Sequence, residues 1–201
     1  IFVAEADESD GSFLAYKPFG AIITNIELDH VDNFHSLDEM DELFAQFIAS
    51  IQSGGFLVAC IDDSGVNRAL SRIQRTDLTV ITYGEASSAD LKIDRISLTQ
   101  SGSISRVTWK GRVLGELHLK VPGRHNVANA AATLATALHL GFSTEQIIAG
   151  LQSFTGARRR FEIKGEENGV TVVDDYGHHP TEIRVTLEAR SEEHTSELQS
   201  H

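Results

Sequence analysis

The sequence predicts an α/β fold in which a mostly parallel central sheet is flanked by helices and followed by a small antiparallel meander and the beginning of a second unit. Two observations support this prediction. Over residues 1–83, short apolar runs alternate with segments in which apolar residues recur at spacings of three and four. Over residues 90–121, apolar and polar residues alternate with a period of two. The first pattern is typical of β-α-β units and the second of hairpins.

The first two strands are predicted at residues 1–5 and 20–26, because both runs are short, apolar and bounded by polar loops. Ser36 and Glu39 form a capping-box pattern, which predicts that a helix starts there. Apolar residues then recur on one face of this helix to about residue 53, where two glycines end it.

The strands at 56–61 and 78–83 are predicted to continue the parallel sheet, with a short helix between them. The meander is predicted at 91–96, 104–109 and 113–119, with glycine-containing turns between its strands. An alanine-rich helix and a second helix are expected after it. They are predicted from about Asn126 to Leu140 and from Thr144, capped by Ser143, to about Phe154.

A glycine- and arginine-rich stretch at 156–160 predicts a hinge or domain boundary. Beyond it, residues 161–163 and 170–174 are expected to be strands, and Pro180 to lie in the first turn of a helix that continues to about residue 190. These elements are too few for a stable core, so we expect them to begin a further domain. The predicted organisation is one domain at 1–156, the start of another at 157–190, and a non-native tail at 191–201 that resembles translated adapter read-through. We therefore expect the chain to be a fragment.

The chain of 201 residues carries 17 Lys and Arg against 29 Asp and Glu, which gives a formal net charge of −12. This balance argues against nucleic acid or an anionic membrane as the main partner, but a metal ion could still make a site for an anionic small molecule. The single cysteine, Cys60, excludes a disulfide within the chain and fits a reducing, cytoplasmic setting. Its apolar neighbours predict a buried thiol. No apolar run approaches the ~20 residues of a membrane span, and no signal peptide is visible.

Acidic residues follow each of the first two predicted strands. They are Glu5, Asp7, Glu8 and Asp10 after the first, and Glu27 and Asp29, with His30, after the second. Open α/β sheets bind ligands at the carboxyl ends of their strands. Mg²⁺ would take one or two carboxylates plus substrate phosphate there, although histidine is an untypical ligand for it. The alternative is a set of solvated loop acids with a capping aspartate.

Three further groups of residues could bind a nucleotide. Asn126 and Asn129 are spaced to share a helix face and could pair with an adenine edge, or else Asn126 caps a core helix. The arginines at 158–160 could clamp phosphates, or form a solvated basic hinge. At 174–182 two acids and two histidines precede a helix. A zinc site is conceivable there, but no third residue lies at a spacing typical of zinc ligands. We therefore favour a role for Asp175 in binding ribose hydroxyls, as acidic residues do in nucleotide-binding folds.

Five runs, taken in order, resemble the Mur ligase family. They are EADESDGSFL (5–14), TNIELDHVD (24–32), GRHNVANAAA (123–132), RRRFE (158–162) and DDYGHHPTEI (174–183). The resemblance covers about residues 1–189. It implies a three-domain enzyme with a UDP-substrate domain, a central P-loop-type ATPase domain and a C-terminal Rossmann-like domain. This chain would hold most of the second and the start of the third, with the Gly-rich phosphate loop upstream.

The resemblance also implies roles for individual residues. Glu5 and His30 match the family's Mg²⁺ ligands, Arg160 its phosphate-contacting arginine, and Asp175 the acid on the ribose. Domain closure would bring Arg160 and Asp175 onto the nucleotide. The carbamylated lysine that some members use for a second metal is not identifiable. The adenine-contacting segment is matched by His125, Asn126 and Asn129, and the amino-acid pocket by Tyr176, His178 and His179.

The implied activity is the ATP-dependent joining of L-alanine to the carboxylate of UDP-N-acetylmuramate through an acyl phosphate, in peptidoglycan precursor synthesis. The ligases that recycle murein tripeptide rank second, because they tend toward Phe-Ala where this chain has Tyr176-Gly177. A non-catalytic nucleotide-binding module with the same fold is the rival from another class. Without the phosphate loop, the chain alone is expected to be inactive.

Overall fold

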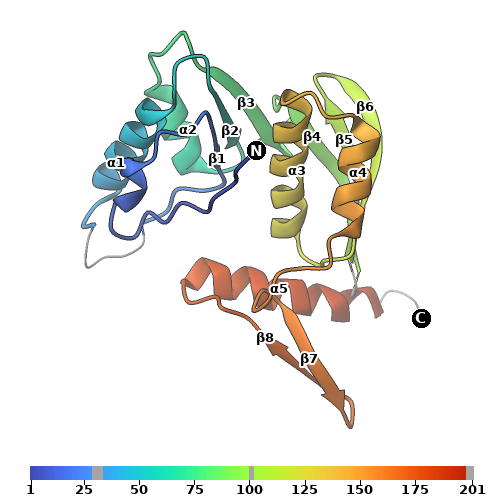
Figure 1. Ribbon diagram of the computed structural model, residues 1–201. Coiled ribbons are helices and arrows are strands. Elements are labelled where there is room, and N and C mark those ends of the chain that lie inside the picture. The colour runs from blue at the N-terminus through green and yellow to red at the C-terminus, as the bar shows by residue number, and fades with distance from the viewer. Residues whose placement is uncertain (29–33, 100–101, 198–201) are drawn as a thin grey trace. The chain divides into compact units, whose positions relative to one another are not determined.

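The computed structural model describes residues 1–28, 34–99 and 102–197 (Figure 1). It divides into two compact units, Ile1–Lys92 and Ile93–His201, with the division inside strand β4 (Leu91–Thr99). Six strands are hydrogen-bonded in the order β1-β2-β3-β4-β5-β6, and β7 and β8 form a separate sheet. The predicted α/β class is confirmed. The predicted domain boundary at residue 156 lies inside the second unit and stays a prediction.

The first unit is built on the parallel strands β1 (Gly20–Ile23), β2 (Phe56–Cys60) and β3 (Thr79–Gly84). Strand β2 pairs with both of its neighbours in parallel, and all five of its residues are buried. The first residues of β4 extend this parallel pairing, with Leu91 opposite Tyr83. A central strand that is covered on both faces reads as a continuous apolar run, which is why β2 was predictable.

Three helical elements complete the first unit: the 3₁₀ turn η1 (Ser12–Ala15), α1 (Leu37–Ser50) and α2 (Ser64–Ser71). The predicted apolar face of α1 is buried except for Leu37, which is 48% exposed. Phe13 of η1 packs against Phe44 and Phe47 of α1, with ring centroids 5.6 and 4.6 Å apart. These aromatic contacts fasten the segment before β1 to the helix.

The predicted cap of α1 forms, with one change. Ser36 Oγ accepts a hydrogen bond from Glu39 N at 3.2 Å, but Glu39 Oε2 reaches back one residue further than a capping box requires, to His35 N at 2.7 Å. On the side of α1 that faces α2, the buried Asp41 accepts a bidentate pair of bonds from Arg68 and a further bond from Arg72. The two helices are thus joined by charge as well as by apolar contact.

The strand predicted at residues 1–5 is not formed. Ile1, Phe2 and Val3 are 91%, 93% and 84% exposed, and residues 1–8 have no regular structure. An apolar run becomes a strand only where a neighbour supplies ladder hydrogen bonds and covers its side chains. Within the parts that the structure describes, β1 ends the sheet order and pairs with β2, and no strand pairs with this run.

The second unit contains the predicted meander, formed by β4, β5 (Gly102–Trp109) and β6 (Arg112–Leu119). Strands β5 and β6 are antiparallel, and the turn between them places Lys110 and Gly111 at φ 45° and 82°. Two central residues with positive φ are typical of the tight hairpin turn that suits twisted strands. Sequence periodicity therefore identified these strands correctly, with ends shifted by a few residues.

Two helices, α3 (Arg124–His139) and α4 (Thr144–Ser153), pack against each other and against β5 and β6 (Figure 1). Helix α4 begins at the predicted cap, where Ser143 and Gln146 form a complete capping box. Helix α3 begins two residues before the predicted start, so Asn126 is not its N-cap. Its N-cap is Gly123, which has no side chain to give a sequence signal.

The chain ends with the hairpin β7 (Glu162–Glu167) and β8 (Val170–Asp174) and with α5 (Pro180–Glu197). Helix α5 starts at the predicted proline and continues beyond the predicted end near residue 190. The hairpin keeps large apolar side chains exposed, with Ile163 at 60% and Val170 at 63%. Among the residues described, no helix is both long and apolar enough to cross a membrane.

Candidate functional site

The acidic cluster after residue 4 makes turns. Asp7 Oδ1 accepts a hydrogen bond from Ser9 N at 2.9 Å, and Asp10 Oδ1 accepts one from Ser12 N at 2.8 Å. The hydrogen bonds from Ser12 hold the pKa of the Asp10 carboxyl below its usual range. Aspartates that bond the backbone two residues on are common turn formers. Two of the acids in this cluster, Asp7 and Asp10, therefore have a local structural use.

Glu5, the predicted metal ligand, lies exposed in the irregular stretch before these turns. The second predicted ligand, His30, lies outside the described residues. Among the side chains that the structure describes, in residues 1–28, 34–99 and 102–188, no group of three or more His, Cys, Asp or Glu is arranged to hold a metal ion. An exposed carboxylate fits an ion that takes its other ligands from water and phosphate, as Mg²⁺ does, and does not fit a metal held by protein alone.

Two other aspartates lie at the carboxyl end of β2, where ligands often bind in such sheets. Both accept hydrogen bonds from backbone N–H groups. Asp62 accepts hydrogen bonds from Glu85 N and Ala86 N, at 2.6 and 3.0 Å. Asp63 caps α2 through Val66 N at 2.8 Å and also accepts from Ile26 N at 3.2 Å. These bonds fix the loops that leave β1 and β3. Cys60 is buried as predicted, and burial raises the pKa of its thiol.

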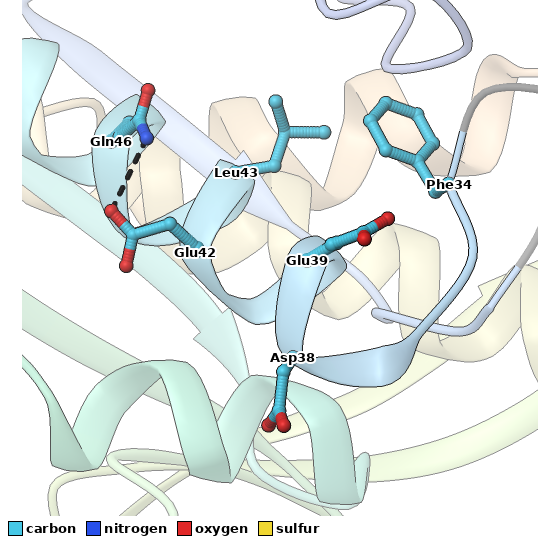
Figure 2. Close-up of a pocket in the computed structure, with 6 residues that line it drawn as sticks. All are labelled: Phe34, Asp38, Glu39, Glu42, Leu43 and Gln46. Carbon is cyan, nitrogen blue, oxygen red and sulfur yellow. Dashed lines mark hydrogen bonds between the residues drawn. The ribbon is translucent and has the colours of Figure 1, made fainter.

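A shallow hollow of about 470 Å³ lies beside the first turns of α1 (Figure 2). Apolar groups of Phe34 and Leu43 face it, and carboxylates lie around them. Two of these carboxylates are already engaged, since Glu39 bonds His35 N and Glu42 Oε1 accepts from Gln46 Nε2 at 3.2 Å. None of the residues predicted from the sequence to bind substrate lines this hollow.

In the second unit, three predicted residues from separate segments interact electrostatically. His125, half-buried in the first turn of α3, has its pKa lowered mainly by burial, while the charge of Asp175 raises it and the charge of Arg160 lowers it. The net shift is downward, so the imidazole is neutral near pH 7, with one ring nitrogen as donor and the other as acceptor. Asp175 and Arg160 thus both lie within electrostatic reach of His125.

The two asparagines lie near His125 on the same helix. Asn126 is partly buried and its Nδ2 donates to Pro122 O at 2.6 Å, which fixes the side-chain amide. Its Oδ1 and its second N–H are not part of that bond. Asn129 lies exposed three residues further along α3. The predicted pair therefore shares a face, as the spacing required.

Asp175 ties together the segments on either side of the β7–β8 hairpin. Its Oδ2 accepts from Phe161 N at 2.8 Å and its Oδ1 from Gly177 N at 2.7 Å. A Cβ at position 177 would lie 2.8 Å from that Oδ1, so only glycine fits without displacing the carboxylate. Because each carboxylate oxygen has two lone pairs, Asp175 keeps acceptor capacity for a further hydroxyl.

Tyr176 lies against the arginine run. The guanidinium carbon of Arg159 is 4.4 Å from the centre of its ring and that of Arg160 is 5.9 Å away. Tyr176 N also donates to Arg159 O at 2.7 Å. Cation–π contacts of this kind favour Arg over Lys and hold the planar guanidinium groups close to the loop.

Glu182 is a residue of this region to which the sequence reasoning gave no role. Its Oε1 is 3.3 Å from Arg160 Nη1, and its Oε2 accepts from His178 N at 3.1 Å and His179 N at 3.3 Å. The signal was present, because a Glu at the third position of a helix that follows a loop often reaches back to the backbone before the helix. His178 itself turns its Nδ1 toward Tyr176 O at 3.3 Å.

Two family models match this chain. The Mur ligase middle domain matches residues 1–137, and the glutamate ligase domain of Mur ligases matches residues 159–198. Because the middle-domain model matches more than half of the chain, the chain belongs to the Mur ligase family.

The chain is similar to several named ligases. It is 48% identical over 189 residues to the UDP-N-acetylmuramate–L-alanine ligase of Acidothermus cellulolyticus, which covers 94% of this chain and 40% of the relative. The crystal structure of UDP-N-acetylmuramate-alanine ligase MurC from Thermotoga maritima matches with a TM-score of 0.76 and 29% identity, over 93% of this chain and 41% of that one. A murein peptide ligase from Psychrobacter arcticus matches with a TM-score of 0.66 and 27% identity, over 89% and 36%. The chain spans about two fifths of the length of the curated relatives it matches.

Proposed function

We propose that this chain is part of a cytoplasmic ligase that uses ATP to join L-alanine to the carboxylate of UDP-N-acetylmuramate in peptidoglycan precursor synthesis. The observation that carries the proposal is the 48% identity, over 94% of the chain, to a relative named for this reaction. The polar region around Arg160, Asp175 and Glu182 supports it, because it offers groups suited to phosphate and sugar hydroxyls.

The chemistry explains why such a region is needed. A carboxylate is a poor electrophile, so the proposed first step transfers the γ-phosphoryl group of ATP to it and releases ADP. The amine of L-alanine then attacks the carbonyl carbon of the acyl phosphate, loses a proton, and expels inorganic phosphate. Bringing a carboxylate to a phosphate is repulsive by about 1 kcal/mol per pair of charges at 4 Å in water, and by more in a cleft. Positive charge placed beforehand offsets that repulsion.

Five residues of the second unit have proposed roles in binding ATP. Arg160 contacts phosphate oxygens with its guanidinium fork. Asp175, already fixed by two backbone N–H groups, accepts hydrogen bonds from ribose hydroxyls. The neutral His125 and the amides of Asn126 and Asn129 contact the adenine.

The incoming amino acid is proposed to bind at the loop after β8, against Tyr176, His178 and His179. The neighbouring arginines support this assignment, since Arg159 lies over the Tyr176 ring and could meet a free carboxylate. The pair Tyr176-Gly177 favours L-alanine ligases over ligases that recycle murein tripeptide. A glycine at position 177 is also explained by the structure, since a side chain there would displace the Asp175 carboxylate.

Glu5 and His30 are proposed to hold Mg²⁺, which would neutralise phosphate charge when bound. Glu5→Ala and His30→Ala in the full-length ligase should each abolish Mg²⁺-dependent ADP release. Glu8→Ala is the control, because Glu8 is a neighbouring acid to which no metal role is assigned. Near-normal turnover of both Glu5→Ala and His30→Ala would refute the metal assignment.

The acyl-phosphate route can be tested by isotope transfer. If UDP-N-acetylmuramate is labelled with ¹⁸O in its carboxylate, one labelled oxygen should appear in the inorganic phosphate, because that oxygen bridges to phosphorus in the intermediate. Unlabelled phosphate accompanying amide formation would contradict the route. The chain alone contains no Gly-rich phosphate loop of the GxxxxGK[ST] type, so it should form no amide by itself.

A further inference from the structure

One carboxylate joins three segments of the proposed binding region. Glu182 projects from the first turn of α5, and its Oε1 pairs with Arg160 Nη1 at 3.3 Å. Its Oε2 accepts hydrogen bonds from the backbone N–H groups of His178 and His179. The turn that carries Arg160, the loop that carries His178 and the helix therefore meet at a single acidic group.

We propose that Glu182 is a positioning residue for the amide-forming reaction, with a separate task for each of its oxygens. Oε1 holds the Arg160 guanidinium ready for a substrate phosphate, and Oε2 fixes the loop at 176–179 that receives the amino acid. This inference rests on the proposed function and adds to it a group that acts through its neighbours and touches no reacting atom.

Charge and exposure explain why the contact positions groups more than it stabilises the fold. Burial raises the pKa of Glu182, but the N–H groups of His178 and His179 and the charge of Arg160 outweigh burial and hold the pKa below its ordinary value. The group is thus an anion near pH 7. The ion pair lies at the surface, with side chains 50% and 37% exposed, and such pairs add little to stability. Its main effect is to restrict a long, flexible arginine side chain.

The backbone around Arg160 gives independent support. Both of its neighbours have left-handed conformations, with φ 58° at Arg159 and 50° at Phe161. Each is held by a carboxylate, since Glu162 Oε2 accepts from Arg159 N at 2.9 Å and Asp175 Oδ2 accepts from Phe161 N. Non-glycine residues keep such conformations only where their surroundings enforce them, and they cluster at functional sites. Glu182 completes this arrangement by holding the side chain between them.

The simpler alternative is that Glu182 only caps α5. The two roles separate by atom, because capping uses Oε2 and positioning of Arg160 uses Oε1. Glu182→Gln keeps a carbonyl oxygen for the backbone N–H groups but turns an amide donor toward Arg160, which cannot accept from it. Glu182→Ala removes both contacts. Glu166→Gln is a matched control on the exposed face of β7.

The test is steady-state kinetics of the full-length ligase with these variants. For Glu182→Gln we expect kcat to fall about tenfold while the KM for L-alanine stays within about twofold of wild type. For Glu182→Ala we expect the same fall in kcat together with an L-alanine KM raised about tenfold. Glu166→Gln should match wild type. Wild-type kcat in Glu182→Gln would overturn the positioning of Arg160 and leave a cap only.

A second measurement does not depend on activity. Hydrogen exchange of the full-length protein should become faster at the amides of residues 178–179 in Glu182→Ala and remain at the wild-type rate in Glu182→Gln. Unchanged exchange in Glu182→Ala would overturn the role of Oε2. A wild-type protein that makes no alanine amide would refute the proposed function, whereas active wild type with variants equal to it would refute only the role of Glu182.

Discussion

Two regions of this chain are held in shape by different interactions. In the unit Ile1–Lys92, order comes from apolar burial, with Phe13, Phe44 and Phe47 all less than 10% exposed. In the segment 158–182, large apolar side chains stay exposed, with Ile163 at 60% and Val172 at 55%. There the carboxylates of Asp175 and Glu182 hold the loops instead. Substitutions of buried apolar side chains in the first region should therefore change folding, and substitutions of the polar residues at 158–182 should change activity.

The largest effect is expected at Arg160. Arg160→Ala in the full-length ligase should lower kcat/KM about 10³-fold, because a guanidinium that faces phosphate charge is lost while little buried surface changes. The comparison requires that thermal stability stay near wild type. Arg184→Ala, an exposed arginine on α5, is the control and should retain activity. A destabilised Arg160→Ala protein would show that the two regions do not differ in this way.

The converse effect is expected at Phe13. Phe13→Ala should lower the free energy of unfolding by about 3–5 kcal/mol, since the side chain is 2% exposed and packs on two aromatic rings. Ile163→Ala in the hairpin should cost less than about 0.5 kcal/mol, because that side chain is largely in water. Urea denaturation measures both. Equal losses of unfolding free energy in the two variants would contradict the proposal that apolar burial stabilises the first region more than the hairpin.

A smaller effect should follow from crowding Asp175. Gly177→Ala places a Cβ 2.8 Å from Asp175 Oδ1 and must shift the carboxylate. We expect the KM for ATP to rise about tenfold with stability almost unchanged, because the bond from Gly177 N is strained and not removed. Gly165→Ala, with no atom within 4 Å of the added Cβ, is the matched control. An unchanged KM in Gly177→Ala would argue against a ribose contact at Asp175.

The smallest effect is a pH dependence at His125. Its pKa in the folded chain lies below the ordinary value of 6.5, so the unfolded chain binds more protons between the two values. Stability should then rise with pH across that interval and be lost as pH falls from 6.5, by no more than about 1.4 kcal/mol per pH unit. His125→Gln should flatten this part of the stability profile. An identical slope in the variant would contradict the burial of a neutral imidazole.

Local sequence patterns predicted the elements whose order is set within a few residues. Ser143 and Gln146 cap α4 as expected, and period-two alternation located β5 and β6. The run at 1–5 failed because a strand depends on a partner elsewhere, which an apolar pattern does not specify. The start of α3 was misplaced because its cap, Gly123, has no side chain.

The candidate site, like the fold, was predicted only in part from the sequence. Family-like runs selected His125, Arg160 and Asp175, and in the structure the charges of Arg160 and Asp175 both act on His125. The position of Glu182 in the first turn of α5 was a signal for its bonds to the backbone of His178 and His179. Its pairing with Arg160 could not be predicted, because that contact depends on how the chain folds back beside α5. The acidic composition alone does not distinguish Glu5 from Asp7 and Asp10, whose carboxylates are used in turns, and only the resemblance to the family selected Glu5.

The central proposal is that this chain belongs to a ligase specific for L-alanine. The most direct test is a competition assay of the full-length protein with UDP-N-acetylmuramate, ATP, and equal concentrations of L-alanine and murein tripeptide, with products identified by mass. We predict that the L-alanine amide dominates and that one ADP is released for each amide formed. A product dominated by the tripeptide, or ATP binding with no amide at all, would contradict the account.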